Sequence, residues 1–191
     1  MKTKILTEVS ARHIHLCQKD FEKLFGKNEK IAPLKELSQE GEFASDKIVE
    51  LKNGDRIIRN VRILGPFRKE SQAEIALTDA YLLKLKPLPK IKVSGDLANT
   101  TKIEVRSKKT AVKIPCIIAQ RHIHISEEEA KKLRLKNNQR VSVRVNGIRG
   151  ITFHDVVVRI AKNYRLALHL DTDEGNAAGI FGKTFGEIIK E

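Results

Sequence analysis

Residues 10–16 read SARHIHL, and residues 119–125 read AQRHIHI. Four of the chain's six histidines lie in these two copies. In a β-strand, the side chains of residues i and i+2 point to the same face. Each His-x-His therefore predicts two imidazoles side by side, with an apolar residue directed to the opposite face. A phrase that occurs twice predicts a fold made of two related halves.

Histidine pairs of this kind are candidate metal ligands. Neutral imidazole is the commonest protein ligand for zinc and similar metals, and the two copies supply His13, His15, His122 and His124. A single pair is more often a half-exposed polar strand face, because short motifs carry little specificity. The identical Arg-His-Ile-His in both copies favours a metal site in each half. A closed structural zinc site is the alternative, and it is disfavoured because such sites recruit close pairs of cysteines, whereas Cys17 and Cys116 are far apart.

Each half offers one further polar residue within an apolar strand. Glu74 alternates with apolar neighbours in residues 72–77, and His169 does the same in residues 165–170. A polar side chain in such a strand either faces solvent or is held by a partner. Three protein ligands with an open position is typical of catalytic zinc. The two expected ligand sets are His13, His15 and Glu74 in the first half, and His122, His124 and His169 in the second. The remaining histidine, His154, falls in a predicted turn.

Both halves follow one order of elements. An apolar strand, residues 4–11 or 112–120, leads into the His-x-His strand, and a helix is predicted directly after it. In the second half, Ser126 and Glu129 have the spacing of a capping box. In the first half, an apolar helix face ends at Gly26. Short strands with turn signals such as Asn-Gly follow in both halves. This pattern predicts a mostly β (α+β) fold with short capping helices, built as two small β-barrel domains related by an internal repeat.

Composition limits the class of protein. The 191 residues, 40% of them apolar, suffice for a real core. The sequence contains no run of about 18 apolar residues, so no membrane-spanning helix is predicted. The first residues lead into a strand without an apolar signal core, and the two cysteines form no framework, so we expect a cytoplasmic chain.

The net charge of +13 favours anionic partners. Nucleic acid is disfavoured because the chain has no tryptophan, two tyrosines and no aromatic residues interleaved with basic ones. A small polyanionic substrate explains the charge at least as well, and an abundance of surface lysine explains much of the excess. Residues 64–72, LGPFRKESQ, form a predicted loop with a basic tip. Arg68 at this tip has the planar fork that suits a phosphate oxyanion, although an arginine on an isolated turn is usually only solvated.

Five segments match one known family in order and spacing. They are residues 10–16, residues 64–75, residues 94–97 (SGDL), residues 119–124 and residues 171–179 (DTDEGNAAG). Together they resemble the phosphate propanoyltransferase family, the PduL-type phosphotransacylases. The resemblance extends over residues 4–182, which is nearly the whole chain.

The resemblance implies an enzyme with two zinc ions that exchanges coenzyme A and phosphate on a short acyl group. It assigns the two zinc ions to the two ligand sets named above, with Arg68 handling phosphate and Glu74 in the catalytic set. The family's coenzyme A pocket matches Ser10, Lys35, Arg62, Leu64, His169 and Asn176. Acyl-CoA and phosphate are thus the expected partners, without nucleic acid or membrane, and we expect a homodimer or higher homo-oligomer.

The resemblance also implies how the domains are divided. The first strand joins the barrel of the C-terminal half, so residues 1–11 with 120–191 form one domain and residues 12–119 the other, with the active site between them. Microcompartment members of the family carry an N-terminal encapsulation helix, which this sequence lacks, and a free cytoplasmic enzyme is therefore expected. Cys17 stands where serine is usual. A metal-dependent hydrolase of acyl-CoA or related esters is the alternative activity, and a nucleic-acid-binding module is the non-enzyme alternative.

Overall fold

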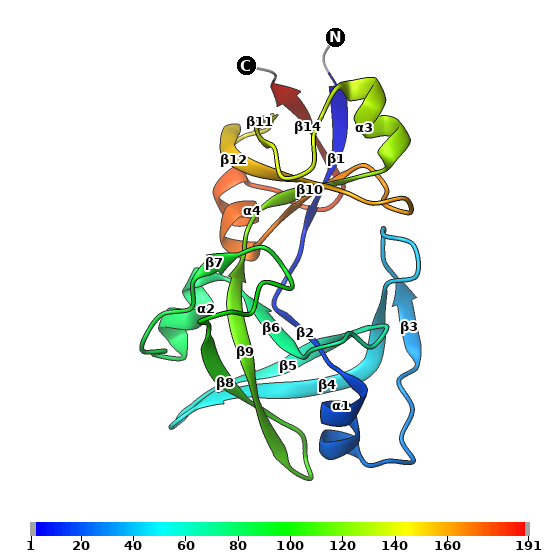
Figure 1. The fold of residues 1–191 in the computed structure, drawn as a ribbon. Coiled ribbons are helices and arrows are strands. Elements are labelled where there is room, and N and C mark those ends of the chain that lie inside the picture. Colours follow the sequence, from blue (N-terminus) through cyan, green and yellow to red (C-terminus); the bar gives the residue numbers. More distant parts are fainter. Residues whose placement is uncertain (1–2, 190–191) are drawn as a thin grey trace. The chain divides into compact units, whose positions relative to one another are not determined.

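The computed structural model describes residues 3–189, which contain fourteen strands and four short helices (Figure 1). The helices are α1 (Gln18–Phe25), α2 (Leu77–Leu82), α3 (Glu127–Leu133) and α4 (Thr172–Ala178). The strands of the first half are β1 (Thr3–Val9), β2 (His13–His15), β3 (Pro33–Glu36), β4 (Phe43–Asn53), β5 (Arg56–Gly65), β6 (Gln72–Ile75), β7 (Ile91–Lys92) and β8 (Thr101–Arg106). Those of the second half are β9 (Ala111–Ala119), β10 (His122–Ile125), β11 (Arg140–Val145), β12 (Ile151–Ile160), β13 (Ala167–Leu170) and β14 (Thr184–Ile189).

One closed barrel, here called the C-terminal barrel, has the strand order β1-β13-β10-β12-β11-β14. Its β1 comes from the opposite end of the sequence, so one blue strand lies among yellow, orange and red ones in Figure 1. Strand β1 is parallel to β13 and antiparallel to β14. The prediction that the first strand joins the barrel of the C-terminal half is therefore confirmed.

The second barrel, here called the N-terminal barrel, contains the strands β4-β5-β2-β6-β9-β8 and closes by the pairing of β8 with β4. Strands β3 and β7 extend this sheet, at β4 and β9 respectively. Its β9 is parallel to β6 and antiparallel to β8. In the C-terminal barrel, β1 has the same two relations to β13 and β14. Each barrel is thus completed by the strand that precedes the other barrel's His-x-His strand, and the internal repeat is a repeat of topology.

Each barrel has its own apolar core. Ile14, between the two histidines of β2, is fully buried in the core of the N-terminal barrel. Ile123 has the same place in β10 and in the core of the C-terminal barrel. Because side chains alternate along a strand, the histidines on either side are directed away from these cores. The prediction of two imidazoles on one face and an apolar residue on the other is confirmed in both copies.

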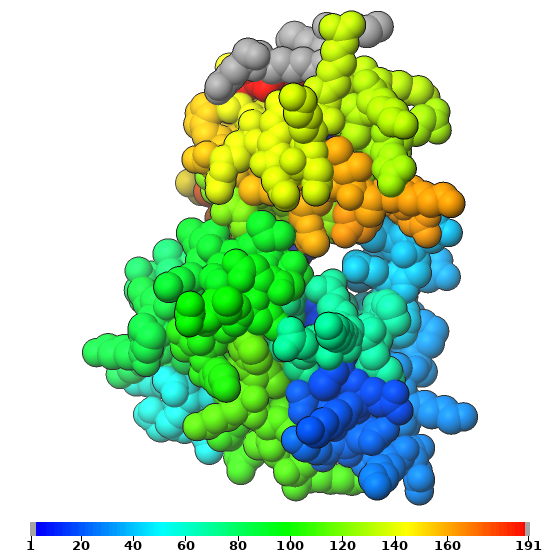
Figure 2. All heavy atoms as spheres, viewed as in Figure 1, coloured from blue at the N-terminus to red at the C-terminus, as the bar shows by residue number. Residues whose placement is uncertain are grey.

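A helix follows each His-x-His strand, as predicted. Helix α1 buries Phe21 and Leu24 and ends at Gly26. In Figure 2 its blue atoms lie on the outside of the N-terminal barrel, beside the β8–β9 hairpin, where the Ser107 hydroxyl donates to the Leu24 carbonyl at 2.6 Å. Helix α3 has Ser126 as its N-cap, whose oxygen accepts from the Glu129 backbone N–H.

Helices α2 and α4 follow the strands of Glu74 and His169, and the sequence patterns do not predict them.

Chain contacts group residues 3–10, 38–40 and 120–189 into one unit, and residues 11–37 and 41–119 into the other. None of the helices within residues 3–189 has the length and apolar character that a bilayer crossing demands.

Candidate active site

The first predicted ligand set lies on two neighbouring strands of the N-terminal barrel. Strand β2 carries His13 and His15, and the antiparallel β6 places Glu74 directly opposite His13. Nε2 of His13 is 3.7 Å from Oε2 of Glu74, and Nε2 of His15 is 3.7 Å from Oε1 of the same carboxylate. All three residues are buried, and their candidate ligand atoms lie within 4.8 Å of one another. The strand register alone brings the predicted set together.

The His13 ring is oriented for metal binding. Its Nδ1 lies 2.8 Å from the Ala11 carbonyl oxygen, which can only accept, so Nδ1 carries the proton. The lone pair is then on Nε2, the atom that faces Glu74. Zinc bonds of about 2.0–2.1 Å at tetrahedral angles separate two ligand atoms by roughly 3.4 Å. The observed separations of 3.7 Å are close to this, and the donor set of two imidazoles and a carboxylate suits zinc.

The electrostatics of this set favour the forms that bind metals. Burial acts to raise the pKa of Glu74, but His13, His15, the Ser94 hydroxyl and Arg68 together lower it to about 2. Burial in the first place, and His13 in the second, hold the pKa of His15 well below its usual value. Metal ligation requires an ionised carboxylate and neutral imidazole, and the protein supplies both around neutral pH.

The second predicted set lies in the C-terminal barrel, at equivalent positions. Strand β10 carries His122 and His124, and the antiparallel β13 places His169 directly opposite His122. The ring centroids lie 4.6 Å (His122–His124), 4.8 Å (His124–His169) and 5.2 Å (His122–His169) apart. Nδ1 of His122 lies 2.8 Å from the Gln120 carbonyl oxygen, which repeats the His13–Ala11 hydrogen bond. Tyr164 stacks on His124 at 4.0 Å. The structure therefore gathers three imidazoles where the first barrel has two and a carboxylate.

The Arg68 loop is attached to the end of the first His-x-His strand. The Arg68 backbone N–H donates to the Leu16 carbonyl at 2.9 Å, and the Cys17 N–H donates to the Ser71 hydroxyl at 2.9 Å. The loop starts at Gly65, where a Cβ would lie 2.2 Å from the Phe43 ring, so only glycine fits. As predicted from the sequence, the loop brings its guanidinium to the ligand set, with Nη1 of Arg68 3.9 Å from Oε1 of Glu74.

One hydroxyl connects this guanidinium to the carboxylate. Ser94, in the loop between β7 and β8, donates to Oε1 of Glu74 at 2.6 Å. It accepts from Nη1 of Arg68 at 2.8 Å and from Nε2 of Gln72 at 2.7 Å. A hydroxyl has one proton and two lone pairs, so these three contacts use all of them. Glu42 holds the other side of the guanidinium, with its Oε1 3.3 Å from Nη2 of Arg68.

The roles of Ser94, Gln72 and Glu42 are not predicted from the sequence. Ser94 belongs to the SGDL segment that matches the family, so the sequence marks Ser94 as a candidate functional residue. It does not predict which residues Ser94 contacts. Gln72 is within the predicted strand of Glu74, on the same face two residues earlier. Glu42 precedes β4, and nothing in its sequence neighbourhood connects it to Arg68.

The residues that match the family's coenzyme A pocket are divided between the two barrels. Arg62 and Leu64 in β5 pair with His13 and His15 of β2, so they adjoin the first ligand set. Lys35 is exposed on β3. In the C-terminal barrel, the Ser10 N–H donates to the Leu170 carbonyl at 2.8 Å, beside His169 in the sequence. Asn176 is exposed on α4.

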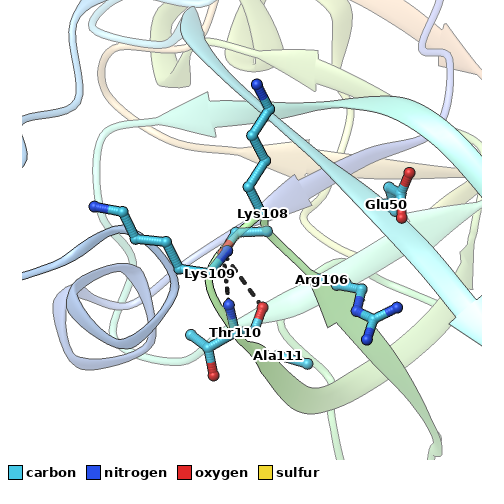
Figure 3. A pocket seen from close by; sticks show the side chains of 7 residues that line it. Glu50, Arg106, Lys108, Lys109, Thr110 and Ala111 are labelled. Carbon is cyan, nitrogen blue, oxygen red and sulfur yellow. Dashed lines mark hydrogen bonds between the residues drawn. The ribbon is translucent and has the colours of Figure 1, made fainter.

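Two other features lie outside the candidate site. His154, which the sequence places in a turn, is instead an exposed residue of β12, next to Asp155 with φ +54°. A bulged register in this part of the β11–β12 pair accounts for the turn-like sequence. A pocket of about 330 Å³ is lined by Glu50 of β4 and by residues 106–111 of the β8–β9 hairpin. In Figure 3 the Lys108 and Lys109 side chains point in different directions, so they do not converge on one anion.

Comparisons with known proteins agree with this geometry. The family model for phosphate propanoyltransferase matches residues 6–181. A phosphate propanoyltransferase of Alkaliphilus metalliredigens is 42% identical over 98% of this chain and 88% of its own length. That of Lachnoclostridium phytofermentans is 44% identical over 95% of this chain and 84% of its own length. That of Citrobacter freundii is 40% identical over 93% and 89%, respectively.

The matched range contains both ligand sets, the Arg68 loop and Ser94. Together with an identity near 40% over almost the full length, this establishes the family that the sequence resembles. The chain belongs to the phosphate propanoyltransferase family and is an acyltransferase of the phosphotransacylase type.

Proposed function

We propose that this chain converts a short-chain acyl-CoA and inorganic phosphate into an acyl phosphate and free coenzyme A, reversibly, at a site with two zinc ions. The observation that carries the proposal is the Arg68 guanidinium, which is held 3.9 Å from Glu74 of a buried three-ligand metal set. Positive charge beside a metal set suits phosphate, and the relatives' name, phosphate propanoyltransferase, specifies the same co-substrate.

Arg68 binds and orients the phosphate. Ser94 and Glu42 fix the direction of its fork, and the remaining N–H groups are donors for phosphate oxygens. An oriented phosphate oxygen attacks the thioester carbonyl carbon. The new C–O bond forms and the C–S bond breaks, so the electron pair leaves on the sulfur of coenzyme A, which takes up a proton when it is released. No acyl group is transferred to the protein in this route.

Zinc bound by His13, His15 and Glu74 would polarise the thioester carbonyl and stabilise the negative charge of the leaving thiolate. The buried Glu74 carboxylate keeps this ligand set ionised because its pKa is about 2. His122, His124 and His169 are three imidazoles without a carboxylate among them, and we assign the second zinc ion to them. The first set is the catalytic one in this proposal, since Arg68 and Ser94 contact it directly.

Coenzyme A is assigned to the residues that match the family's pocket. They are Ser10, Lys35, Arg62, Leu64, His169 and Asn176. Support comes from Arg62 and Leu64, which pair with His13 and His15 across β5 and β2. The cations among these residues suit the phosphates of coenzyme A.

The test is product analysis with the metal-free protein and with protein reconstituted with Zn²⁺ or Co²⁺. Acetyl-, propanoyl- and butanoyl-CoA are each incubated with and without phosphate, and acyl phosphate is trapped with hydroxylamine. We expect metal-dependent acyl phosphate formation that requires phosphate. Free acid released at the same rate without phosphate would identify a metal-dependent hydrolase, and no turnover with either metal would overturn the proposal.

A further inference from the structure

The arginine that precedes each His-x-His makes the same contact in both barrels. In the N-terminal barrel, Nε of Arg12 donates to Oδ1 of Asp79 at 2.8 Å. Asp79 lies in the first turn of α2, and its side chain is 1% exposed. Its other oxygen, Oδ2, accepts from the Ala76 backbone N–H at 3.1 Å. The acid therefore connects Arg12 to the backbone at the start of α2, two residues after Glu74.

The C-terminal barrel repeats this arrangement with a glutamate. Nη1 of Arg121 donates to Oε1 of Glu174 at 2.8 Å, in the first turn of α4. The other oxygen of Glu174, Oε2, accepts from the Asp171 backbone N–H at 3.0 Å. Asp171 is two residues after His169, just as Ala76 is two residues after Glu74. The acid is five residues after the third ligand in both halves.

These contacts join the start of one ligand strand to the end of the other. Arg12 lies between His13 and Ala11, whose carbonyl accepts the proton of Nδ1 of His13. Arg121 lies between His122 and Gln120, whose carbonyl has the same role. When the acid holds the arginine side chain, it also fixes the adjoining backbone carbonyl that orients the first imidazole of the set. The acid holds the residues that follow the third ligand.

We propose that Arg12 and Arg121 are positioning residues, each of which sets the geometry of its own barrel's three-ligand metal set through the acid at the start of the following helix. The proposal rests on the metal sites of the proposed function. Neither guanidinium is a ligand or a substrate contact in this role. The Ala11 and Gln120 carbonyl groups hydrogen-bond the first imidazole of each set, and loss of such a partner typically changes metal affinity by about 10–100-fold.

At position 121, the role depends on two directional donors of the arginine side chain. Arg121 uses two of them, since its Nε also donates to the His154 carbonyl at 2.7 Å while Nη1 contacts Glu174. Lysine offers a compact charge without this planar fork. The Arg121 side chain thereby holds both β12, at His154, and the start of α4, at Glu174. A lysine at the same position would not make both contacts.

The test measures Co²⁺ affinity of the full-length protein, for each of the two sites, by the absorption of bound cobalt and competition with a chelator. The variants are Arg12→Gln and Arg121→Gln. We expect each to weaken one of the two sites by about 10–100-fold and to leave the other at the wild-type affinity. The matched control is Arg59→Gln, which removes the exposed Arg59–Glu50 ion pair of the N-terminal barrel and leaves both affinities unchanged.

The double variant Arg12→Gln/Asp79→Asn removes the unpaired buried carboxylate that Arg12→Gln alone creates. It remains testable if the single variant does not fold. We expect it to weaken cobalt binding as the single variant does, because both lack the same connection. In the metal-free double variant, the Nδ1 proton of His13, observed by NMR, should exchange faster with water than in the wild type.

The outcomes separate this inference from the proposed function. Wild-type cobalt affinity at both sites in Arg12→Gln or the double variant, with an unchanged His13 proton, would overturn the positioning role even if acyl phosphate is formed. A wild-type protein that makes no acyl phosphate would overturn the reaction. The positioning role would still stand if the substitutions speed exchange of the His13 proton.

Discussion

His13 and Glu74 lie directly opposite each other on antiparallel strands, with 3.7 Å between Nε2 of the histidine and Oε2 of the carboxylate. In the C-terminal barrel the opposed pair at this position is His122 and His169. Equal registers with different third ligands give the two sets different charges. The first set carries an ionised carboxylate whose pKa is about 2 and is the one in contact with Arg68. This difference predicts a division of labour between the two sets.

Glu74→Gln should abolish turnover and remove one of two bound zinc ions. The amide keeps the shape of the side chain but loses the charge that the ligand set requires. We expect activity to fall by more than the roughly 10–100-fold that is typical of outer partners of a metal ligand. Zinc is measured by elemental analysis beside the rate of acyl phosphate formation. The control is Glu70→Gln, at an exposed glutamate of the Arg68 loop. We expect this variant to keep both zinc ions and full activity. Two zinc ions retained in Glu74→Gln would contradict the assignment.

Arg68→Ala should lose activity and keep both metals. The guanidinium binds phosphate in our proposal and lies 3.9 Å from Glu74. It is not itself a metal ligand, because a guanidinium has hydrogen-bond donors only. We expect a loss of about 10²–10³ in turnover, the usual size for removal of one preorganised donor to a transition-state charge. Arg68→Lys should recover only part of this, because it lacks the fork. Lys69→Ala, at the exposed neighbouring residue, is the matched control. Full activity of Arg68→Ala would remove the arginine from the mechanism.

The grouping of the candidate ligand residues could be predicted from the sequence because it depends on strand periodicity. His13 and His15 share a face by alternation, and Glu74 and His169 stand out as polar residues within apolar strands. The barrels also follow from short strands and a repeat. Apart from the repeat, which relates residues 10–16 to residues 119–125, each of these signals is contained in fewer than ten residues.

What could not be predicted depends on contacts between distant segments. Ser94, in the loop between β7 and β8, donates to Glu74, and Glu42, the residue before β4, accepts from Arg68. No periodicity relates these positions. Helix α4 is not predicted from the sequence, although Asp171 and Glu174 form a capping box, because its seven residues, TDEGNAA, are too short and too polar for an apolar periodicity. The sequence around His154 predicts a turn because a strand bulge with positive φ at Asp155 has the same local residue pattern as a turn.

Ser94→Ala should weaken both functions that its hydroxyl connects. The change removes the donor to Glu74 and the acceptor for Arg68 and Gln72. We expect zinc affinity of the first set to fall by about 10-fold and the KM for phosphate to rise, because Arg68 loses one of its two anchors. Ser107→Ala, at a hydroxyl of the distant β8–β9 hairpin, is the control. An unchanged KM for phosphate and unchanged zinc affinity in Ser94→Ala would show that the Ser94 hydroxyl supports neither phosphate binding by Arg68 nor zinc binding by Glu74.

In the metal-free protein, His15 should make a contribution to stability that decreases as the pH falls from 7.5 to 5.5. Burial first, and the His13 charge second, keep the pKa of His15 well below its usual value of 6.5. The unfolded chain gains a proton on this residue as the pH falls through 6.5, and the folded chain does not. The stabilising contribution is therefore complete above pH 6.5 and is lost below it. We expect the free energy of unfolding to fall by up to about 1.4 kcal/mol per pH unit from this residue.

Urea unfolding followed by circular dichroism at pH 7.5, 6.5 and 5.5 measures the effect. His15→Gln should have a shallower pH dependence than the wild type, since its side chain does not titrate. Equal slopes for wild type and His15→Gln would show that His15 takes up its proton in the folded state as readily as in the unfolded one.

Cys17→Ser should retain turnover and both zinc ions. Cys17 is the N-cap of α1, two residues after His15, and its sulfur lies 3.3 Å from the Ser71 hydroxyl and 3.5 Å from Oδ2 of Asp20. It is the one cysteine near the first ligand set with any exposure, since Cys116 is buried. Direct attack by phosphate needs no protein nucleophile, so the rate of acyl phosphate formation should change by less than about threefold. A covalent acyl-enzyme on this sulfur, or a sulfur ligand to zinc, predicts a loss of activity or of metal instead.

The same substitution should stabilise the protein. The Cys17 side chain makes no capping hydrogen bond, whereas serine is among the preferred N-cap residues and is worth about 0.5–2 kcal/mol there. A thiol reagent provides the matched measurement on the wild type. Burial first, and the charge of Asp79 second, raise the pKa of Cys116 to about 12, so only Cys17 should react in the native protein. Modified wild type that loses activity while Cys17→Ser stays active would assign the loss to the bulk of the adduct beside the Arg68 loop. Loss of turnover in Cys17→Ser with both zinc ions retained would replace direct attack with an acyl-enzyme route.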